Sequence, residues 1–466
     1  MSLRPVGENR RTRLGSLART SRQLTALAAP IAGVQFTQVA LTTTDLAVMG
    51  LIGVQFIAAG GLAAALYNLM RTMCVGVVTA VGNLVAGAAG QGEARSGSDH
   101  PDAQGQTEIR QITRSAFSVA TVTAMLLGVV LVGLGYILPV FGLDKDVLRL
   151  ARPMMMTLAP GLIPMVWLNV LRQFSVGMRR PGPLLAVSIA SIALNAALDF
   201  VFIYGLLAIP RLGLAGIGLA TTLVQIATVI AFYLMLRRDN QLAPLLSGDG
   251  WKTDALFARE VVRLGIPISL TYGSEAGITS VAAVVMGAFG PIALAAHNVV
   301  TQLTRIAFQI SIGLSHGASI LISRAIARID KQDAQQIATA ALVLGWLTTA
   351  ALGLLYVAAP NWVLRPFLDP ADSSTVVLAK TFLLFAIAQQ IVDFTQNIAI
   401  GLLRGIGNTT AGLRATSIGY WVVGLPAMLL LAFPAHLHGP GVWIGLSTGF
   451  ATTAVLLLRR FRQDLP

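Results

Sequence analysis

Long apolar runs, separated by short polar or glycine- and proline-containing connections, dominate this chain. The chain is 55% hydrophobic and 11% charged, whereas a soluble protein carries roughly 25% charged residues. A helix needs ~20 apolar residues to cross a bilayer. The runs therefore predict twelve membrane-spanning helices rather than a soluble globular fold. Their approximate ranges are 24–50, 55–90, 110–139, 150–176, 183–206, 213–236, 261–288, 292–325, 336–359, 374–403, 411–434 and 440–458.

Basic residues give the chain a net charge of +13, but they are spread over the short connections. This distribution favours a positive-inside signal over a nucleic-acid-binding patch. With the N-terminus inside, the outer connections hold only a few basic residues, namely Lys145, Arg149, Arg152, Arg211, Arg365 and Lys380. The bias predicts an even number of crossings and both termini in the cytoplasm, with residues 1–23 as a basic cytoplasmic tail rather than an export signal.

The two halves of the chain resemble each other. Pro30-Ile31 and Val48-Met49-Gly50 recur at an offset of 237 residues, as Pro267-Ile268 and Val285-Met286-Gly287. Six crossings separate equivalent points, so the halves share one orientation and are related by an axis along the membrane normal. We expect substrate to bind between the two lobes and access to alternate by rocking. The predicted parts are an N-lobe at 24–236, a cytoplasmic linker at 237–258, a C-lobe at 259–460 and a cytoplasmic C-terminus at 461–466.

Four of the 20 carboxylates lie inside the apolar runs: Asp45, Asp199, Glu275 and Asp393. A charge at bilayer depth costs ~2.5 kcal/mol or more, so such residues usually mark ion or substrate paths. Burial disfavours the charged form of a carboxyl group, which can then hold a proton and release it when its cavity opens to water. The alternative is that the acids are inert scaffolding paired with a basic residue of the spans.

Amide side chains accompany two of these acids at helical spacing. Asn195 precedes Asp199 by four residues, and Asp393 is followed by Gln396 and Asn397. Spacings of three and four place these side chains on one helix face, and their oxygen atoms suit a hard cation or a shared proton. Further candidates for a cavity wall are Gln38 and Asn169, which the repeat aligns with Glu275 and Asp393, and the aromatic residues Trp167 and Tyr272.

Several enzymatic motifs are absent from the sequence. No Gly-Lys pair occurs, which excludes a Walker A motif, and neither HExxH nor CxxC is present. The single cysteine, Cys74, excludes an intrachain disulfide and a multi-cysteine metal site. We therefore expect a protein that is not an enzyme, has no cofactor and uses an ion gradient as its energy source.

A set of motifs carries a family resemblance. In chain order they are Asn195…Asp199-Phe-Val-Phe-Ile-Tyr204-Gly205, Gly265-Ile-Pro267…Glu275, Ala295-Ala296-His297-Asn298, Asp393-Phe-Thr-Gln396 with Leu403-Arg404-Gly405, and Tyr420-Trp421-Val-Val-Gly-Leu-Pro426. Together they resemble the multidrug and toxic compound extrusion (MATE) family from about residue 20 to residue 460. The resemblance implies an all-α integral membrane protein with twelve helices in two six-helix lobes around a V-shaped cleft. It also implies export of cationic, often lipophilic drugs in exchange for Na⁺ or H⁺.

The resemblance also implies roles for individual residues. Glu275 and Asp393 are similar to the C-lobe cation-site acids of the NorM branch, and Asp45 is similar to the first-span acid of the family. Asn195 and Asp199 are similar to the N-lobe pair of the DinF branch. The resemblance thus implies two alternative sites for the coupling cation, H⁺ or Na⁺. One site consists of Asp45, Glu275 and Asp393, and the other consists of Asn195 and Asp199; the choice between them stays open. The expected setting is a monomer in a bacterial inner membrane, with organic cations, the coupling ion and the bilayer as partners and no nucleic acid.

Two alternative functions remain. The first is an exporter or flippase of a specific metabolite or lipid-linked substrate, which Arg71 and Arg305 would favour by making the cavity cationic. The second, of a different class, is an ion channel. No re-entrant filter sequence is visible, which speaks against a channel.

Overall fold

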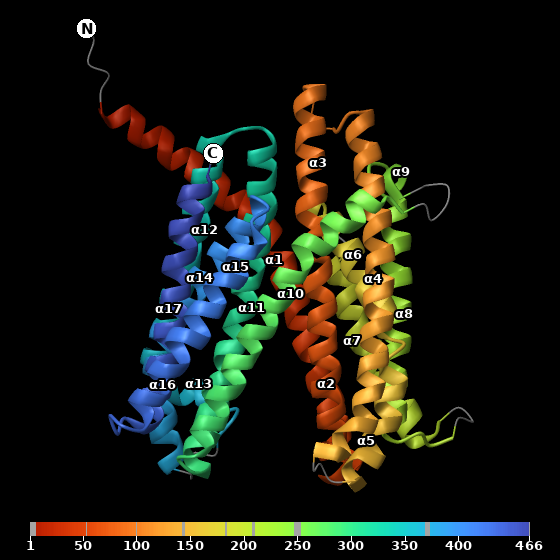
Figure 1. Cartoon of the computed structure of the whole chain (residues 1–466), viewed down its shortest axis with the longest axis vertical. Helices are drawn as coiled ribbons and strands as arrows, with labels where there is room; N and C mark the ends of the chain where they lie inside the picture. Colours follow the sequence, from red (N-terminus) through yellow and green to blue (C-terminus); the bar gives the residue numbers. More distant parts are fainter. Residues whose placement is uncertain are drawn as a thin grey trace. The chain divides into compact units, whose positions relative to one another are not determined.

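The computed structural model describes residues 6–52, 54–98, 100–141, 145–181, 184–206, 210–246, 253–368 and 373–465. These residues form helices joined by short connections, and no strand occurs among them (Figure 1). Helices satisfy their backbone hydrogen bonds internally, which a segment surrounded by hydrocarbon requires. The all-α class predicted from the apolar runs is therefore confirmed.

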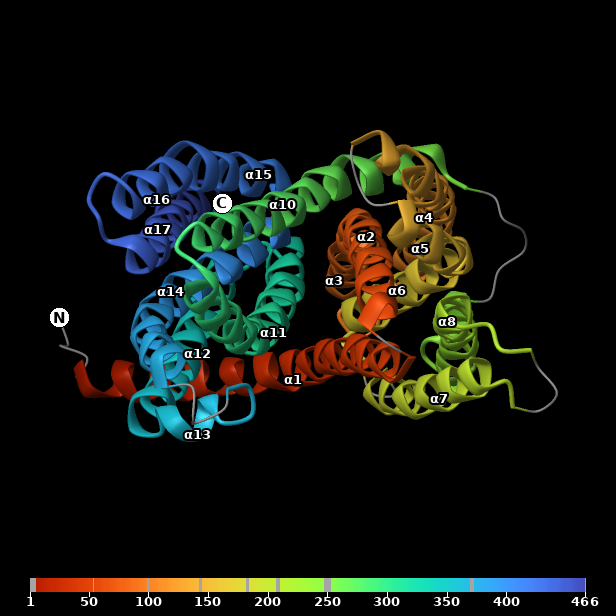
Figure 2. The same cartoon turned by 90° about the horizontal axis from the view of Figure 1, so that it is seen from below.

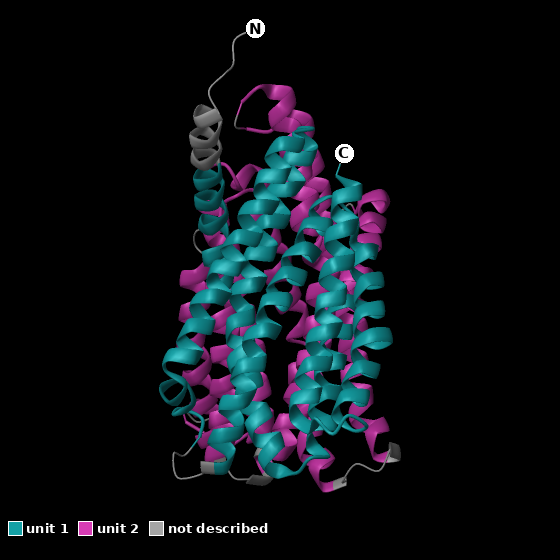
Figure 3. Cartoon of the chain, turned by 90° about the vertical axis from the view of Figure 1, so that its left-hand side faces the viewer, with its two compact units in different colours: residues 1–32, 271–466 teal, residues 33–270 magenta. Residues whose placement is uncertain are grey.

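The chain divides into two compact units, residues 1–32 with 271–466 (unit 1) and residues 33–270 (unit 2), as Figure 3 shows. Helices α1 (Val6–Ile52) and α10 (Ala255–Gly287) each pass from one unit into the other. Each contains a proline shortly before the boundary, Pro30 in α1 and Pro267 in α10. The two boundaries thus fall at nearly equivalent points of the sequence repeat. The lobe bounds 24–236 and 259–460 and the linker remain a prediction, and residues 247–252 of that linker lie outside the described residues.

Unit 2 contains most of the helices of the first half. Helices α7 and α8 lie side by side (Figure 2), and α5 and α6 are two parts of one bent segment with an angle of 46° between them. The elements of unit 2 after α1 are α2 (Val54–Thr79), α3 (Val81–Ser96), α4 (Ala103–Ile137), the 3-10 turn η1 (Leu138–Phe141), α5 (Lys145–Leu158), α6 (Leu162–Gly177), α7 (Leu184–Tyr204), α8 (Leu214–Arg238) and α9 (Ala243–Leu246).

Unit 1 contains the helices that follow α10. Helix α14 packs against α11, α12 and α17, and α16 packs against α17. The elements are α11 (Pro291–Ala327), α12 (Lys331–Ala358), α13 (Pro360–Leu364), α14 (Ser373–Gly405), α15 (Thr409–Thr416), the π-helical segment η2 (Ser417–Gly424), α16 (Leu425–Ala432) and α17 (His438–Asp464).

The predicted spans correspond to the observed helices. Among the described residues, 10 helices are long and apolar enough to cross a membrane, and the bent pair α5–α6 raises this number to 11. The remaining predicted span, 261–288, coincides with most of α10, which has 33 residues but is less apolar because it carries Glu275 and several hydroxyl and basic residues. Segments 55–90 and 411–434 are each built from more than one helical element.

Glycine allows the π-helical segment to lie against α17. A Cβ atom on Gly419 would lie 2.7 Å from the carbonyl oxygen of Gly449, so no larger residue fits there without movement. Small residues at such contacts let helix backbones approach closely, which is how helices associate in lipid. This packing fixes the position of Tyr420, which is fully buried and contacts the ring of Phe450 at a centroid distance of 5.1 Å.

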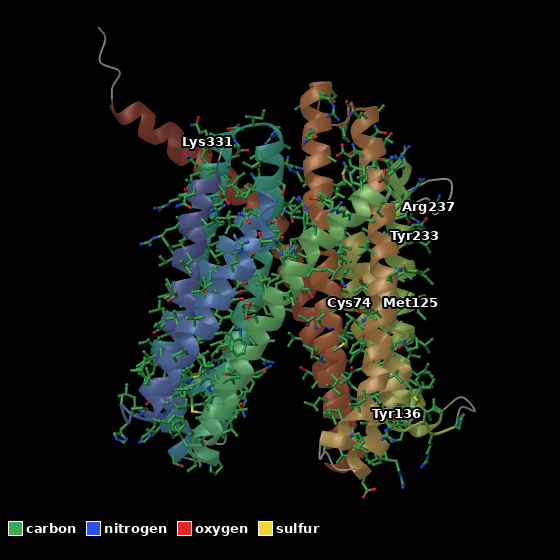
Figure 4. The ribbon with its side chains drawn as sticks, in the orientation of Figure 1. Cys74, Met125, Tyr136, Tyr233, Arg237 and Lys331 are labelled. Atoms are coloured by element: carbon green, nitrogen blue, oxygen red, sulfur yellow. The ribbon has the colours of Figure 1, made fainter. Side chains whose placement is uncertain are left out.

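Tyrosine–arginine contacts mark opposite ends of the helices of unit 2. The Arg152 guanidinium lies 4.8 Å from the ring centroid of Tyr136, and the Arg237 guanidinium lies 5.7 Å from that of Tyr233. Figure 4 shows Tyr136 at the end of α4 away from Tyr233, with Cys74 between these levels in α2. Tyrosine and arginine are typical of the two membrane–water interfaces, so the spans of unit 2 run between these two levels.

Candidate functional site

A buried cluster of Asp45, Asn195 and Asp199 connects two helices of unit 2. Asp45 lies in the part of α1 that belongs to unit 2, and the other two residues lie one turn apart in α7. The Asn195 Nδ2 atom donates to Asp45 Oδ1 at 2.7 Å and to Asp199 Oδ2 at 2.8 Å. Asn195 is 1% exposed and Asp199 is fully buried, whereas Asp45 is half-buried. One amide therefore bridges both acids.

The two carboxyl groups of this cluster are also close to each other. Asp45 is within hydrogen-bonding reach of Asp199 and of Thr221 in α8. The second oxygen of Asp199, Oδ1, is buried and accepts no hydrogen bond from a donor in the described part of the chain. Two adjacent carboxyl groups in a buried place are not both ionised without a compensating cation. A shared proton between them, or a bound cation, would satisfy the free oxygen atom.

A cavity of about 60 Å³ adjoins this cluster. The polar residues of its wall include Asp45, Asn195, Gln38, Asn68 and Arg71. The apolar part of the wall is formed mainly by Leu41, Met49, Met154 and Leu158. Of the predicted cavity residues, Gln38 is thus placed beside the acid cluster.

A second cluster lies in unit 1, where Asp393 is held by amides of its own helix. The Gln396 Nε2 atom and the Asn397 Nδ2 atom both donate to Asp393 Oδ1, at 3.0 Å and 3.1 Å. Gln396 is fully buried and Asn397 is 5% exposed. The predicted common face of these three residues of α14 is therefore observed.

Glu275 of α10 and Tyr420 of η2 complete the cluster of unit 1. Glu275 is half-buried and lies within hydrogen-bonding reach of Asn397 and near Asp393. The Tyr420 hydroxyl donates to Gln396 Oε1 at 3.0 Å. A π-helical segment such as η2 widens the helix and often occurs at functional sites. Tyr420 thus anchors the amide that holds Asp393.

Three predicted cavity residues form hydrogen bonds with partners other than the buried acids. Asn169 is 6% exposed and its Nδ2 atom donates at 2.9 Å to the Met165 carbonyl oxygen of its own helix. Trp167 donates from Nε1 to Thr121 Oγ1 at 2.9 Å and lines a separate hollow. The hydroxyl of Tyr272 accepts a hydrogen bond from Arg404 Nη1 at 3.2 Å. None of these contacts involves an acidic residue.

Sequence reasoning missed several site residues that other helices supply. Thr221 of α8 and Tyr420 of η2 are the clearest, and Tyr67 of α2 lies in the same cavity wall as Arg71. Tyr420 could have been found, because it opens the Tyr-Trp pair of the last family motif. Thr221 gives no such signal, since a threonine in an apolar helix is common.

The two clusters offer a metal ion carboxyl, amide and hydroxyl oxygens as ligands. The described residues contain no group of three or more His, Cys, Asp or Glu side chains that could hold a metal ion. Each cluster instead combines two carboxyl groups with amide oxygens, and unit 2 adds the Thr221 hydroxyl. Such a set suits a proton or a hard, singly charged cation better than a transition metal.

Comparison with known proteins identifies the family. The family model described as MatE matches residues 30–201 and 267–430. These two blocks begin at Pro30 and Pro267, the first matched positions of the internal repeat. The match covers more than half of the 466 residues.

Curated relatives and solved structures agree with this match. The chain is 36% identical over 440 residues to the "Probable multidrug resistance protein NorM" of Pseudomonas aeruginosa, covering 93% of this chain and 88% of the relative. It is 35% identical over 443 residues to the protein of that name from Bradyrhizobium diazoefficiens, covering 94% and 92%. The fold is similar to that of a solved structure described as the outward-facing conformation of a multidrug resistance MATE family transporter of the MOP superfamily. The TM-score is 0.83 at 17% sequence identity, and the match covers 96% of each chain. The predicted family and the predicted MATE fold are confirmed, and the chain is a multi-pass membrane protein that belongs to the MatE family of transporters.

Proposed function

We propose that this protein is a multidrug efflux antiporter that exports organic, often lipophilic cations in exchange for H⁺ or Na⁺. The family and the multidrug resistance names of its relatives support efflux transport. The buried acid clusters support coupling to a cation, because each places two carboxyl groups where an extra positive charge is needed.

The observation that carries the proposal is the bridge from Asn195 to Asp45 and Asp199. It joins α1 to α7, and among the residues that the structure describes it leaves Asp199 Oδ1 without a donor. A cation or proton that binds there neutralises the site, and its departure leaves a site that attracts a cationic drug. Coupling follows if the two ligands favour different states of the protein. We therefore place the coupling site at this cluster and assign a second cation-binding role to Glu275 and Asp393.

The proposed cycle is alternating access between two lobes in a bacterial inner membrane, with a monomer as the working unit and both termini in the cytoplasm. The bacterial relatives support the location, and the distribution of basic residues supports the orientation. The absence of a Walker A motif from the sequence supports an ion gradient as the energy source.

Efflux of ethidium from vesicles, with Na⁺ and pH gradients imposed separately, tests the proposal. We expect export to follow one of the two gradients in vesicles that contain the protein and to be absent in vesicles without it. Export that continues with both gradients collapsed, or ethidium movement that does not saturate, would contradict antiport and favour a channel.

A further inference from the structure

A second cavity of unit 2, of about 390 Å³, lies between α4, α6, α8 and α9. Helix α6 packs against both α4 and α8 and supplies Trp167 and Leu171 to the wall. The short helix α9, which also packs against α4 and α8, supplies Leu245 and Leu246 (Figure 1). No acidic side chain is among the described residues that line this cavity, so it is separate from the acid cluster of unit 2.

Arg110 and Arg114 give this cavity two positive charges. They lie four residues apart in α4, so they share one face of the helix. The Arg110 Nε atom donates to the Pro244 carbonyl oxygen at 3.0 Å, which ties the side chain to α9. In the described part of the chain, neither arginine forms an ion pair with an acid. A wall with two guanidinium groups and no carboxylate favours an anion as the ligand.

Two acids lie near this part of α4, but neither is among the described residues of the cavity wall. Asp254 is held beside α4 because the Ser115 hydroxyl donates to its carbonyl oxygen at 3.1 Å, and its Oδ1 atom accepts from the backbone N–H of Leu256 at 2.8 Å. Glu108 precedes Arg110 by two residues, and side chains two apart do not face each other on a helix. The charge of the wall is thus not balanced from within it.

The lining changes from basic to aromatic and apolar along the helices. On α4, Phe117 follows Arg114 by three residues, and its ring contacts that of Trp167 at a centroid distance of 6.2 Å. On α8, Ile230 precedes Tyr233 by three residues, on the side away from the helix end. Because Tyr233 marks one of the two membrane–water levels, the cavity extends from the level of the lipid headgroups into that of the acyl chains.

Exposed apolar side chains continue this wall toward the centre of the spans. On α4, Val122 follows the cavity residue Ser118 by four residues and Met125 follows Val122 by three, so all three share one face. Val122 is 68% and Met125 is 56% exposed, and Ile230 and Ile226 of α8 are 53% and 40% exposed. Figure 4 shows Met125 between the levels of Tyr233 and Tyr136. In a membrane protein, acyl chains cover such a surface, and a lipid lying there would bring its headgroup to the two arginines.

We propose that the cavity between α4, α6, α8 and α9 binds an anionic phospholipid, with the phosphate at Arg110 and Arg114 and an acyl chain along Phe117 and Ile230. The guanidinium fork matches phosphate oxygens with paired, charge-assisted hydrogen bonds, and basic pockets between spans at this level suit lipid headgroups. The lipid comes from the leaflet at the α9 end of the helices, which is the cytoplasmic leaflet in the predicted orientation. A zwitterionic lipid binds more weakly, because its ammonium group meets the same two arginines. The site does not depend on the proposed efflux function.

Quenching of tryptophan fluorescence by brominated lipids tests the proposal. The full chain is reconstituted in phosphatidylcholine bilayers that contain a rising fraction of phosphatidylglycerol with brominated acyl chains, which quench a tryptophan on contact. Brominated phosphatidylcholine at the same fractions is the reference lipid. The difference between the wild-type protein and Trp167→Phe isolates the quenching that arises in the cavity. We expect half-maximal quenching of this component at a ~10-fold or more lower fraction of phosphatidylglycerol than of phosphatidylcholine.

Two pairs of arginine substitutions locate the preference. Arg110→Gln with Arg114→Gln should abolish it, and the corresponding pair of lysine substitutions, which keeps the charge but not the fork, should give an intermediate preference. Arg459→Gln with Arg462→Gln is the matched control, because it removes the same charge at the end of α17 in unit 1, outside the cavity wall. This control should keep the wild-type preference. Each variant is used if it elutes as a monodisperse species, and the comparison of the two lipids in the wild-type protein needs no arginine variant.

Several outcomes would overturn the inference. One is equal quenching of the Trp167 component by both brominated lipids in the wild-type protein, and another is a preference that survives in the double glutamine variant of α4. Loss of the preference in the α17 control as well would show that overall charge, rather than this cavity, attracts the lipid. Inorganic phosphate provides the last arm: if it raises the melting temperature of the purified protein as much as phosphatidylglycerol does, and only with both α4 arginines present, the ligand is a free anion and not a lipid. Ethidium export enters none of these outcomes, so the inference and the proposed function can fail separately.

Discussion

The two acid clusters use the same residue types in different arrangements. In unit 2, Asn195 donates to two acids on different helices, and no donor from the described residues reaches Asp199 Oδ1. In unit 1, Asp393 accepts two amide hydrogen bonds from its own helix, at 3.0 Å and 3.1 Å. The two clusters therefore differ in their hydrogen bonds: one Asp199 oxygen lacks a donor in the described part of the chain, whereas Asp393 Oδ1 accepts from two amides. The difference suggests that the coupling cation acts mainly in unit 2.

The largest effect is expected from neutralising the unit 2 pair. Asp45→Asn or Asp199→Asn removes one of two adjacent carboxyl groups, so the site no longer needs the coupling cation. We expect gradient-driven ethidium export to fall by about 5-fold to 150-fold, the usual range of coupling between two ligands. Efflux rates in vesicles of matched protein content measure this effect. Asp239→Asn is the control, because Asp239 pairs with Arg180 at 2.8 Å outside the spans.

A smaller effect is expected from neutralising the acids of unit 1. Asp393→Asn keeps the shape of the side chain, but it places an amide beside the amide donors of Gln396 and Asn397. We expect export to fall several-fold and to remain dependent on the imposed gradient. Glu275→Gln should behave in the same way. Loss of gradient dependence in both unit 1 variants, with the unit 2 variants unaffected, would reverse the assignment of the coupling site.

Removing the Tyr420 hydroxyl should have a modest effect. Tyr420→Phe deletes the hydrogen bond to Gln396 Oε1, which is 3.0 Å long. A typical hydrogen bond contributes about 0.5–1.5 kcal/mol, so we expect the concentration for half-maximal ethidium export to rise no more than about tenfold. The ring contact with Phe450 is retained in this variant. A complete loss of export would mean that the Tyr420 hydroxyl itself binds the transported or coupling cation.

The smallest effect is expected outside the spans, at the connection between α3 and α4. The hydrogen bond from Arg95 and the backbone N–H of Gly105 lower the pKa of Asp102 from its usual 3.8 to about 2. A lowered pKa favours the folded state above the usual value, and this contribution disappears as the pH falls through about 2. Asp102→Asn should leave export unchanged and slightly lower the melting temperature of the detergent-purified protein at pH 7. A clear loss of export at pH 7 would contradict this structural role.

The sequence predicted the helices and the helix faces on which the acids and their amide neighbours lie, because both depend on local patterns. Apolar runs indicate spans directly, and the spacing of Asp393, Gln396 and Asn397 is enough to place them on one face. The same spacing argument joined Asn195 to Asp199. These features need no knowledge of which helices are neighbours.

Contacts between helices far apart in the chain were not predictable in this way. The bridge from Asn195 to Asp45 joins residues 150 positions apart, and nothing in the local pattern of α7 points to α1. Trp167 and Asn169 are further predicted cavity residues, and their hydrogen-bond partners, Thr121 Oγ1 and the Met165 carbonyl oxygen, also gave no signal in the sequence. The helical period predicts the helix face on which a side chain lies. It does not predict which neighbouring helix packs against that face.

Cation release on substrate binding tests the central claim most directly. Purified protein in weakly buffered solution is mixed with ethidium, and released H⁺ or Na⁺ is followed with a pH indicator and a sodium indicator. We predict that the wild-type protein and Asp393→Asn release one of these cations on binding ethidium, whereas Asp45→Asn and Asp199→Asn bind ethidium and release none. Equal release from the wild-type protein and from Asp199→Asn would contradict the account.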